Sequence, residues 1–233
     1  MSALNAYGQP VGPPLPGWTP RPLPPAAPMV GRYCRLERAD ADRHAAELFA
    51  AYAEAPDDRD WTYLPVERPA DASSYAAWLR QAAAQADPFF HAIVDAATGR
   101  ASGVASYLRI DPANGSIEVG HINLAPRLQR TRAATEAMFL MMRRAFDELG
   151  YRRYEWKCDS LNAPSRAAAA RYGFRFEGVF RQAIVYKERS RDTAWFSITD
   201  AEWLQVRAAF ERWLDPANFD DAGQQRAPLA ARC

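Results

Sequence analysis

The sequence predicts one mixed α/β domain whose sheet is mostly antiparallel and contains a central β-α-β crossover. Two observations carry this prediction. From about residue 33 to 213, short alternating or apolar runs typical of strands are interleaved with segments that have apolar residues at helical spacing. Residues 117–174 also run strand, short polar loop, long helix, strand, polar turn and short helix, which is the order of a crossover unit.

The first half of the domain alternates strand and helix patterns, divided by turn residues. Asp40 can cap a helix, and the sequence from Asp111 to Gly115 is a strong turn. Two strands joined by residues 97–100 read as a hairpin. The expected elements are strands at 33–38, 89–95, 102–110 and 117–124, and helices at 40–53 and 73–86.

The second half begins with a long helix that ends at Gly150, a residue suited to the position after a helix. Thr199 and Glu202 have the spacing of a capping box for a final helix. The expected elements are helices at 133–149, 164–172 and 199–213, and strands at 153–158, 175–185 and 193–198.

Two flanking segments differ in composition from this domain. Residues 1–30 are dense in proline, so they cannot form a helix or a central strand, and we expect an N-terminal arm. A ligand for a proline-recognition module is the alternative. Residues 215–233 read as a polar C-terminal tail, which leaves residues 31–214 as the folded domain.

The composition argues against several classes of function. The 29 basic and 28 acidic side chains are too balanced for a broad nucleic-acid-binding surface. No apolar run is long enough to span a membrane, and the N-terminus does not resemble a secretory signal. Cysteine and histidine, three of each, are scattered and suggest neither disulfides nor a metal site. We expect a cytoplasmic protein with no metal and no nucleic-acid or membrane partner; a homodimer is left open.

The stretch from Glu118 to Phe174 carries the clearest functional signal. An apolar strand runs into the basic loop at 126–134, and this loop opens a long helix. Free backbone N–H groups and the helix dipole attract anions to such a helix start. Arg127, Arg130 and Arg132 oppose the dipole unless an anion is bound. The pattern therefore predicts a phosphate-binding site, with a solvated basic rim as the alternative.

This stretch resembles the acetyl-CoA-binding core of the GNAT N-acetyltransferases. Family loops commonly read Gln/Arg-x-x-Gly-x-Gly/Ala; Gln129 and Ala134 match, whereas Arg132 stands where the family usually has glycine. The run from Asn162 to Ser165, followed by a helix and Gly-Phe at 173–174, resembles the segment after the fifth strand of these enzymes. Within the superfamily, the resemblance is closest to the branch that includes the ribosomal-protein N-terminal acetyltransferases.

The resemblance implies a GNAT fold, with a sheet splayed at the cofactor site and flanked by helices, and acetyl-CoA as the acyl donor. It implies that Asn162 hydrogen-bonds the pantetheine arm, although a simple helix N-cap is the alternative. Arg132 could offer a guanidinium to a phosphate in place of the missing glycine contact. The cofactor-binding residues expected on this basis are Ile122, Asn123, Leu124, Gln129, Arg130, Thr131, Arg132, Ala133, Ala134, Asn162 and Ser165.

The resemblance also implies direct attack of an amine on the thioester, without a covalent enzyme intermediate. Many GNAT enzymes use a glutamate on this strand as base, so Glu118 is the first candidate; an ion pair with an arginine is its alternative. His121 is the second candidate. Strand alternation places its side chain on the face opposite Glu118, unless a bulge resets the parity. Ser165 aligns with a serine proposed to protonate the leaving thiolate, and Ala169 leaves the family's usual tyrosine position vacant.

The sequence indicates the residues that bind the acceptor amine less clearly than those that bind the cofactor. Aromatic residues of the loop at 57–69 could form a lid, and an acid beside an arginine would suit a zwitterionic or peptide-like amine. The candidates are Trp61, Tyr63, Asp159, Arg181 and Tyr186. The leading hypothesis is an N-acetyltransferase acting on a protein N-terminus, an amino acid or peptide, or a small amine. The alternative is a non-catalytic acyl-CoA-binding regulatory or scaffold protein with a GNAT-like fold.

Overall fold

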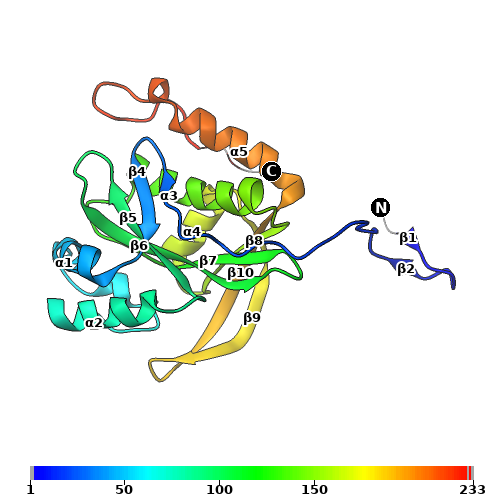
Figure 1. Cartoon of the computed structure of the whole chain (residues 1–233), viewed down its shortest axis with the longest axis horizontal. Helices are drawn as coiled ribbons and strands as arrows, with labels where there is room; N and C mark the ends of the chain where they lie inside the picture. The colour runs from blue at the N-terminus through cyan, green and yellow to red at the C-terminus, as the bar shows by residue number, and fades with distance from the viewer. Residues whose placement is uncertain (1–2, 230, 232–233) are drawn as a thin grey trace.

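An eight-stranded sheet, with the order β3-β4-β5-β6-β7-β8-β10-β9, forms the centre of the computed structural model (Figure 1). The structure describes residues 3–229 and 231. The strands of this sheet are β3 (Met29–Val30), β4 (Cys34–Arg38), β5 (Phe89–Asp95), β6 (Ala101–Asp111), β7 (Ser116–Leu124), β8 (Arg153–Asp159), β9 (Arg175–Tyr186) and β10 (Arg189–Thr199). All neighbours pair antiparallel except β7 and β8, which are parallel because a helix crosses between them.

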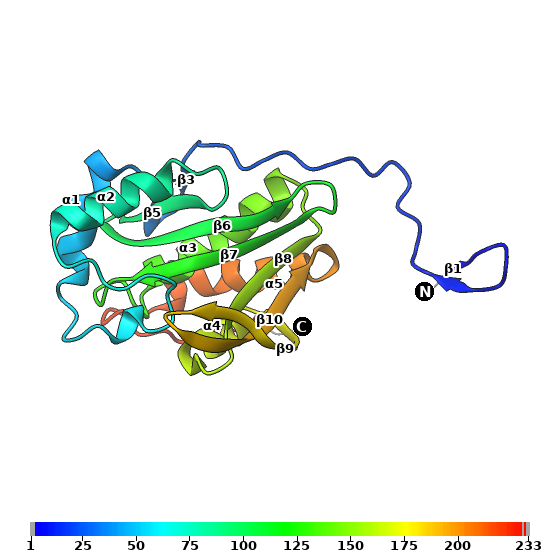
Figure 2. The same ribbon diagram turned by 90° about the horizontal axis from the view of Figure 1, so that it is seen from below.

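Helices cover both faces of the sheet. They are α1 (Ala41–Tyr52), α2 (Ala72–Ala83), α3 (Arg132–Arg143, continued as a π-helical turn over Arg144–Glu148), α4 (Ala163–Arg171) and α5 (Asp200–Leu214). The first two pack on one face, and α3, α4 and α5 pack on the other, so the sheet separates two apolar cores (Figures 1 and 2). The predicted fold class, a mostly antiparallel sheet flanked by helices in one domain, is confirmed.

Local capping explains where several helices begin. The Asp40 carboxylate accepts the N–H groups of Asp42 and Arg43 at the start of α1. Thr199 and Glu202 form the predicted capping box of α5. Each such cap contributes about 1 kcal/mol of helix stability. The caps place the helix starts within a few residues of the positions that the sequence indicates.

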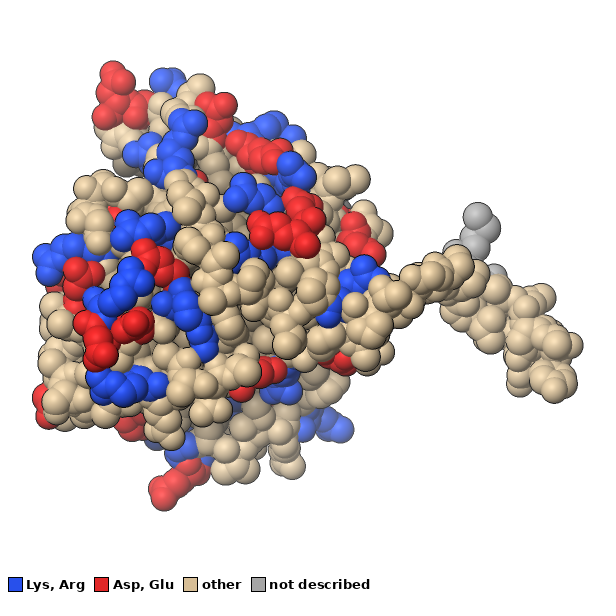
Figure 3. All heavy atoms as spheres, viewed as in Figure 1, with Lys and Arg blue, Asp and Glu red and all other residues tan. Residues whose placement is uncertain are grey.

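The N-terminal arm is held by the domain only along its second half. The indole Nε1 of Trp18 donates to the carbonyl of Ala113 at 2.8 Å, and Arg144 donates to the carbonyls of Ala27 and Pro28. Leu23, between these two contacts, is 64% exposed. The first part projects from the body of the protein and contains a small hairpin of β1 (Ala3–Leu4) and β2 (Pro10–Val11). On the face of the domain visible in Figure 3, acidic and basic side chains are mixed.

One buried carboxylate fixes the chain where the arm enters the sheet. Glu136 of α3 accepts the backbone N–H groups of Arg32 at 2.8 Å, Tyr33 at 2.6 Å and Cys34 at 2.8 Å. Gly31 passes so close to this carboxylate that a Cβ would lie 2.4 Å from it. Glu136 therefore ties α3 to the first turn of the domain.

The segment after α5 is less solvated than its polar composition suggests. Phe219, Leu229 and Ala231 are buried in the same core as α3 and α5.

Cys34 and Cys158 are buried and free, and Cys233 lies outside the described residues. Over residues 3–229 and 231, no helix has the length and apolar character needed to cross a bilayer. The same residues contain no group of His, Cys, Asp and Glu side chains able to hold a metal ion.

Candidate active site

The two parallel strands at the centre of the sheet separate partway along their length. β7 pairs with β8 only from Ser116 to Val119, opposite Arg153 to Trp156, although β7 continues to Leu124 and β8 to Asp159. β8 stays paired with β10 to its end. The opening therefore lies between β7 and β8, where the resemblance places the pantetheine arm.

A β-bulge lies on β7 beside this opening. His121 and Ile122 stand opposite the single residue Ala105 of β6, and His121 has a φ of +47°. The extra residue breaks the alternation of the strand. As a result, His121 and Asn123 face the pocket, on the side of the sheet that carries Ser106 and Val104, rather than the opposite side to which Val119 points.

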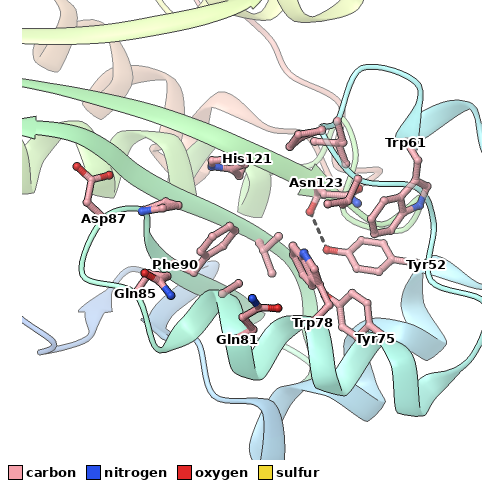
Figure 4. Close-up of a pocket in the computed structure, with 16 residues that line it drawn as sticks. Tyr52, Trp61, Tyr75, Trp78, Gln81, Gln85, Asp87, Phe90, His121 and Asn123 are labelled. Carbon is pink, nitrogen blue, oxygen red and sulfur yellow. Dashed lines mark hydrogen bonds between the residues drawn. The ribbon is translucent and has the colours of Figure 1, made fainter. Parts of the chain in front are cut away.

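A pocket of about 500 Å³ lies between α2 and the sheet (Figure 4). Its floor is formed by β5, β6 and β7, and the loop that follows α1 closes one end, with Trp61 on that loop. The pocket is lined by Tyr52, Trp61, Leu64, Pro65, Val66, Tyr75, Trp78, Gln81, Ala82, Gln85, Asp87, Pro88, Phe90, Val104, His121 and Asn123. The lining is mostly apolar; its polar side chains include those of β7 at one wall and those of Gln81, Gln85 and Asp87.

The hydrogen bonds of His121 define which ring nitrogen is free. Ser106 Oγ donates to the carbonyl of Gly120 at 3.1 Å, so it can accept from His121 Nδ1, which lies 3.0 Å away. Nδ1 therefore carries the proton, and Nε2 has a lone pair with no partner among the described residues. Burial lowers the pKa of His121 below its usual value of about 6.5, so the ring is neutral at pH 7. These are the properties of a general base.

Glu118 occupies a different environment, one of ion pairs. Its carboxylate lies 2.9 Å from Lys157 Nζ and 3.1 Å from Arg109 Nε, and the side chain is 6% exposed. Lys157 also pairs with Glu155 at 2.7 Å. Burial raises the pKa of Glu118, an effect that Lys157 opposes. Glu118 does not line the pocket, so the structure brings His121, not Glu118, to the pocket.

The start of α3 offers an anion site. Thr131 caps the helix by accepting the N–H of Ala134 at 3.1 Å, which leaves the N–H groups of Arg132 and Ala133 without an acceptor among residues 3–229 and 231. Arg130 has a φ of +61°, the left-handed conformation often found where a loop turns into an anion-binding helix start. This geometry fits a pyrophosphate group.

The side chains of the same loop are already engaged within the protein. The guanidinium of Arg132 lies over the rings of Tyr33, at 5.0 Å, and Phe219, at 4.7 Å. The amide of Gln129 donates to the carbonyl of Leu124 at 2.9 Å. Backbone N–H groups are therefore better placed than the Arg132 guanidinium to hold a phosphate, and the predicted phosphate contact of Arg132 stays a prediction.

The start of α4 lies on the other side of the opening. Asn162 caps this helix by accepting the N–H of Ser165 at 3.1 Å, and Ser165 Oγ accepts from Trp156 Nε1 at 3.0 Å. The N-cap reading of Asn162 is thus present, while its contact with the pantetheine arm and the acid role of Ser165 stay predictions. Tyr172 ends α4 and is buried.

The residues predicted for the acceptor side divide into three places. Trp61 lines the pocket, and Tyr63 of the same loop donates to the carbonyl of Leu161 at 3.2 Å. Tyr186 donates to Asp159 at 2.9 Å, away from the pocket lining. Arg181 is exposed on the edge strand β9. Among the described residues, Arg181 makes no ion pair with Asp159.

Sequence reasoning missed most of the pocket wall. Tyr75 and Trp78 fall in the helix predicted at 73–86, and Phe90 falls in the strand predicted at 89–95. Their pattern does not indicate a pocket, because an apolar stripe looks the same whether it meets a core or a cavity. No sequence pattern around Ser106 indicates a functional role for this residue. Its role depends on the bulge that brings His121 to it.

Comparison with known proteins identifies the family. A family model described as an acetyltransferase (GNAT) domain matches residues 35–175. A GCN5-related N-acetyltransferase from Brucella melitensis is 50% identical in sequence with a TM-score of 0.91, over 92% of this chain and 97% of that chain. A structure from Chromobacterium violaceum ATCC 12472, described as a probable acetyltransferase of the GNAT family, is 45% identical with a TM-score of 0.78, over 84% and 97%.

More distant structures share the fold alone. The ribosomal-protein-S5-alanine acetyltransferase from Vibrio fischeri is 17% identical with a TM-score of 0.60, over 76% of this chain and 98% of that chain. No curated protein matches the sequence. The match to the family model over more than half of the chain and the identity to the Brucella structure show that the chain belongs to the GNAT acetyltransferase family.

Proposed function

We propose that this protein transfers an acetyl group from acetyl-CoA to a primary amine by direct attack, with His121 as the general base. The observation that carries the proposal is the free Nε2 of His121 in the pocket beside the opening between β7 and β8. Membership of the GNAT family supports acyl transfer to an amine. When bound, acetyl-CoA supplies the acyl group as an activated thioester.

Two parts of the chain would hold this donor. The N–H groups of Arg132 and Ala133, together with the dipole of α3, suit the pyrophosphate. The segment from Ile122 to Leu124 lies beside the opening, where its backbone can contact the rest of the molecule. Free Cys34 and Cys158 suit a reducing compartment, so a cytoplasmic location is part of the proposal.

The proton chemistry follows from the His121 environment. An ammonium acceptor must lose a proton before its nitrogen can attack, and Nε2 can take that proton. Ser106 holds the opposite nitrogen in the donor state, which keeps Nε2 available. Because burial lowers the pKa of His121, the ring then readily passes the proton on to solvent. A protein N-terminus, as in the ribosomal-protein branch, stays a candidate acceptor from the sequence resemblance.

Amine-dependent thiol release from acetyl-CoA tests the proposal. Purified protein and acetyl-CoA are incubated with a panel of small amines, amino acids, polyamines and peptides with free N-termini. We expect free coenzyme A to appear with at least one amine, above the rate without amine. Tight binding of acetyl-CoA with no release for any amine would support the non-catalytic acyl-CoA-binding alternative instead.

Replacing Glu118 by glutamine separates a structural role from a catalytic one. Because Lys157 keeps Glu155 as a partner, we expect the free energy of unfolding to fall by about 1–3 kcal/mol. Turnover should stay within about threefold of the parent, since Glu118 lies outside the pocket. Chemical denaturation and steady-state kinetics check the two parts. A large loss of turnover with unchanged stability would restore Glu118 as the base.

Replacing Arg132 by alanine tests what holds the phosphates. Because its guanidinium packs on Tyr33 and Phe219, we expect a lower melting temperature and an acetyl-CoA affinity within about threefold of the parent. Calorimetric titration and thermal unfolding measure the two effects. Arg130→Ala, on the same loop, is the matched control. A loss of about tenfold or more in affinity, specific to Arg132, would assign its guanidinium to a phosphate.

A further inference from the structure

We propose that the acceptor is a compact primary amine with an apolar aromatic or branched carbon skeleton, seated in the pocket under α2 with its nitrogen toward His121. This inference rests on the proposed acetyl transfer and names the substrate class of that site. It departs from the zwitterionic or peptide-like acceptor that the sequence suggested.

The pocket walls suit an apolar skeleton. Trp78 of α2 meets Phe90 edge-on with ring centroids 5.8 Å apart, and Tyr52 meets Trp61 edge-on at 5.6 Å. These contacts hold the rings in place, so the apolar surface is formed before a ligand arrives. The volume of about 500 Å³ lies within the range of small-molecule sites.

Polar side chains enter the pocket from β7, which carries His121 and Asn123, and from the opposite side, where Gln81, Gln85 and Asp87 lie. His121 presents its free Nε2, and the side-chain amide of Asn123, 5% exposed, has no hydrogen-bond partner among the described residues. The hydroxyl of Tyr52 binds the backbone carbonyl of Asn123 at 3.0 Å and so fixes this residue from below (Figure 4). This amide is not among the fully buried polar atoms that lack a partner, so it reaches the open volume of the pocket and can hydrogen-bond a ligand there. An amine nitrogen beside both groups would do so.

Charge argues against more polar acceptors. Asp87 is the only charged residue among those that the structure places in the lining, and its two carboxylate oxygens accept the N–H groups of Arg109 at 3.1 Å and Ile110 at 3.0 Å. No lysine or arginine lines the described pocket to pair with the carboxylate of an amino acid. No uncommitted carboxylate is there for the second ammonium of a polyamine. Burying such unpaired charges is unfavourable.

A peptide acceptor would need more main-chain partners than this pocket supplies. An extended peptide gains affinity by hydrogen bonds to a strand edge or to polar side chains. Here the described wall from Leu64 to Val66 offers mainly carbon, and the lining amides of Gln81, on α2, and Gln85, just after it, are exposed to solvent. A small amine whose skeleton needs no such partners fits better.

Substitution of Ala82 by leucine fills the pocket from α2 with a residue that favours helices. The parent and variant are assayed with phenethylamine, isoamylamine, spermidine, alanine and an alanine-initiated peptide. We expect the parent to favour phenethylamine or isoamylamine over the other three by roughly tenfold or more in kcat/KM. Ala82→Leu should lower kcat/KM for phenethylamine by about tenfold and leave acetyl-CoA affinity unchanged. Ala77→Leu, on the exposed side of α2, is the control.

The outcomes separate this inference from the proposed function. If spermidine, alanine or the peptide is the best acceptor, or if Ala82→Leu leaves the preference unchanged, the substrate class is wrong while acetyl transfer stands. If no amine releases thiol, acetyl transfer fails, and quenching of tryptophan fluorescence by phenethylamine tests the pocket alone. Saturable quenching that Ala82→Leu weakens would then still support an apolar-amine site, and its absence would overturn it. Val66→Asp, in the loop, serves as a second variant and should also disfavour phenethylamine.

Discussion

Replacing His121 by glutamine is expected to lower turnover at neutral pH by about 10²-fold or more, because the pocket loses the group that accepts the amine proton. Glutamine keeps a side chain of similar length and can still hydrogen-bond Ser106, so the bulge should survive. The proposed acetyl-CoA site lies elsewhere, mainly at the start of α3, so the affinity for acetyl-CoA should be nearly unchanged. Steady-state kinetics and calorimetric titration of acetyl-CoA measure the two quantities.

The pH profile of the parent gives a second readout of the same residue. Burial lowers the pKa of His121; Asp87 opposes this effect, and Arg109 and Arg191 reinforce it. The base works only when neutral, so kcat should be level near pH 7 and fall as the pH drops through the pKa of His121, below about 6.5. In His121→Gln this acid limb should disappear.

Ser106→Ala serves as the graded control for this residue. It removes the acceptor that holds the Nδ1 proton, so the tautomer with a free Nε2 becomes less favoured. A loss of about tenfold, smaller than that of His121→Gln, is expected. If His121→Gln keeps the turnover of the parent, and its kcat still falls at low pH as in the parent, then His121 is only a structural residue of the bulge.

Replacing Glu136 by alanine is expected to reduce the free energy of unfolding by about 3 kcal/mol or more. The variant leaves the N–H groups of Arg32, Tyr33 and Cys34 without their shared acceptor at the first turn of the domain. It also opens a void against Gly31, which packs directly on the carboxylate. Denaturant titration measures the change, with an unchanged slope showing that the unfolding transition itself is the same.

Glu211→Ala is the matched control for this stability prediction. Its carboxylate makes an exposed ion pair with Arg207 on α5 at 2.8 Å, a contact expected to contribute about 0.3–0.5 kcal/mol. A loss below 1 kcal/mol in Glu136→Ala would mean that water replaces the carboxylate at little cost and that the tie between α3 and the arm is weak.

Much of the fold can be predicted from the sequence because its signals are local. The apolar periodicity, the Asp40 cap and the capping box of Thr199 and Glu202 depend on residues within a few positions of each other. The crossover between β7 and β8 follows from the order of strands and helices. The proposed phosphate site at the start of α3 also rests on a local signal, since any helix start leaves N–H groups free.

The site is predicted less well because its geometry depends on contacts between distant segments. Strand alternation puts His121 opposite Glu118, and only the pairing of β7 with β6 reveals the bulge that turns His121 into the pocket. The Lys157 partner of Glu118 comes from the next strand, 39 positions along, and no pattern near Glu118 indicates it. The aromatic wall of α2 likewise looks like core until the sheet below it is in place.

The most direct test of the account is a single-turnover reaction, with enzyme in excess over acetyl-CoA and a saturating amine from the panel, followed by mass spectrometry of the amine. This measurement isolates the chemical step from binding and product release. The parent should form the N-acetylated amine, and His121→Gln, with the same amount of acetyl-CoA bound, should form it about 10²-fold more slowly or worse. No acetylated amine from the parent, or equal rates in the two proteins, would contradict acetyl transfer with His121 as its base.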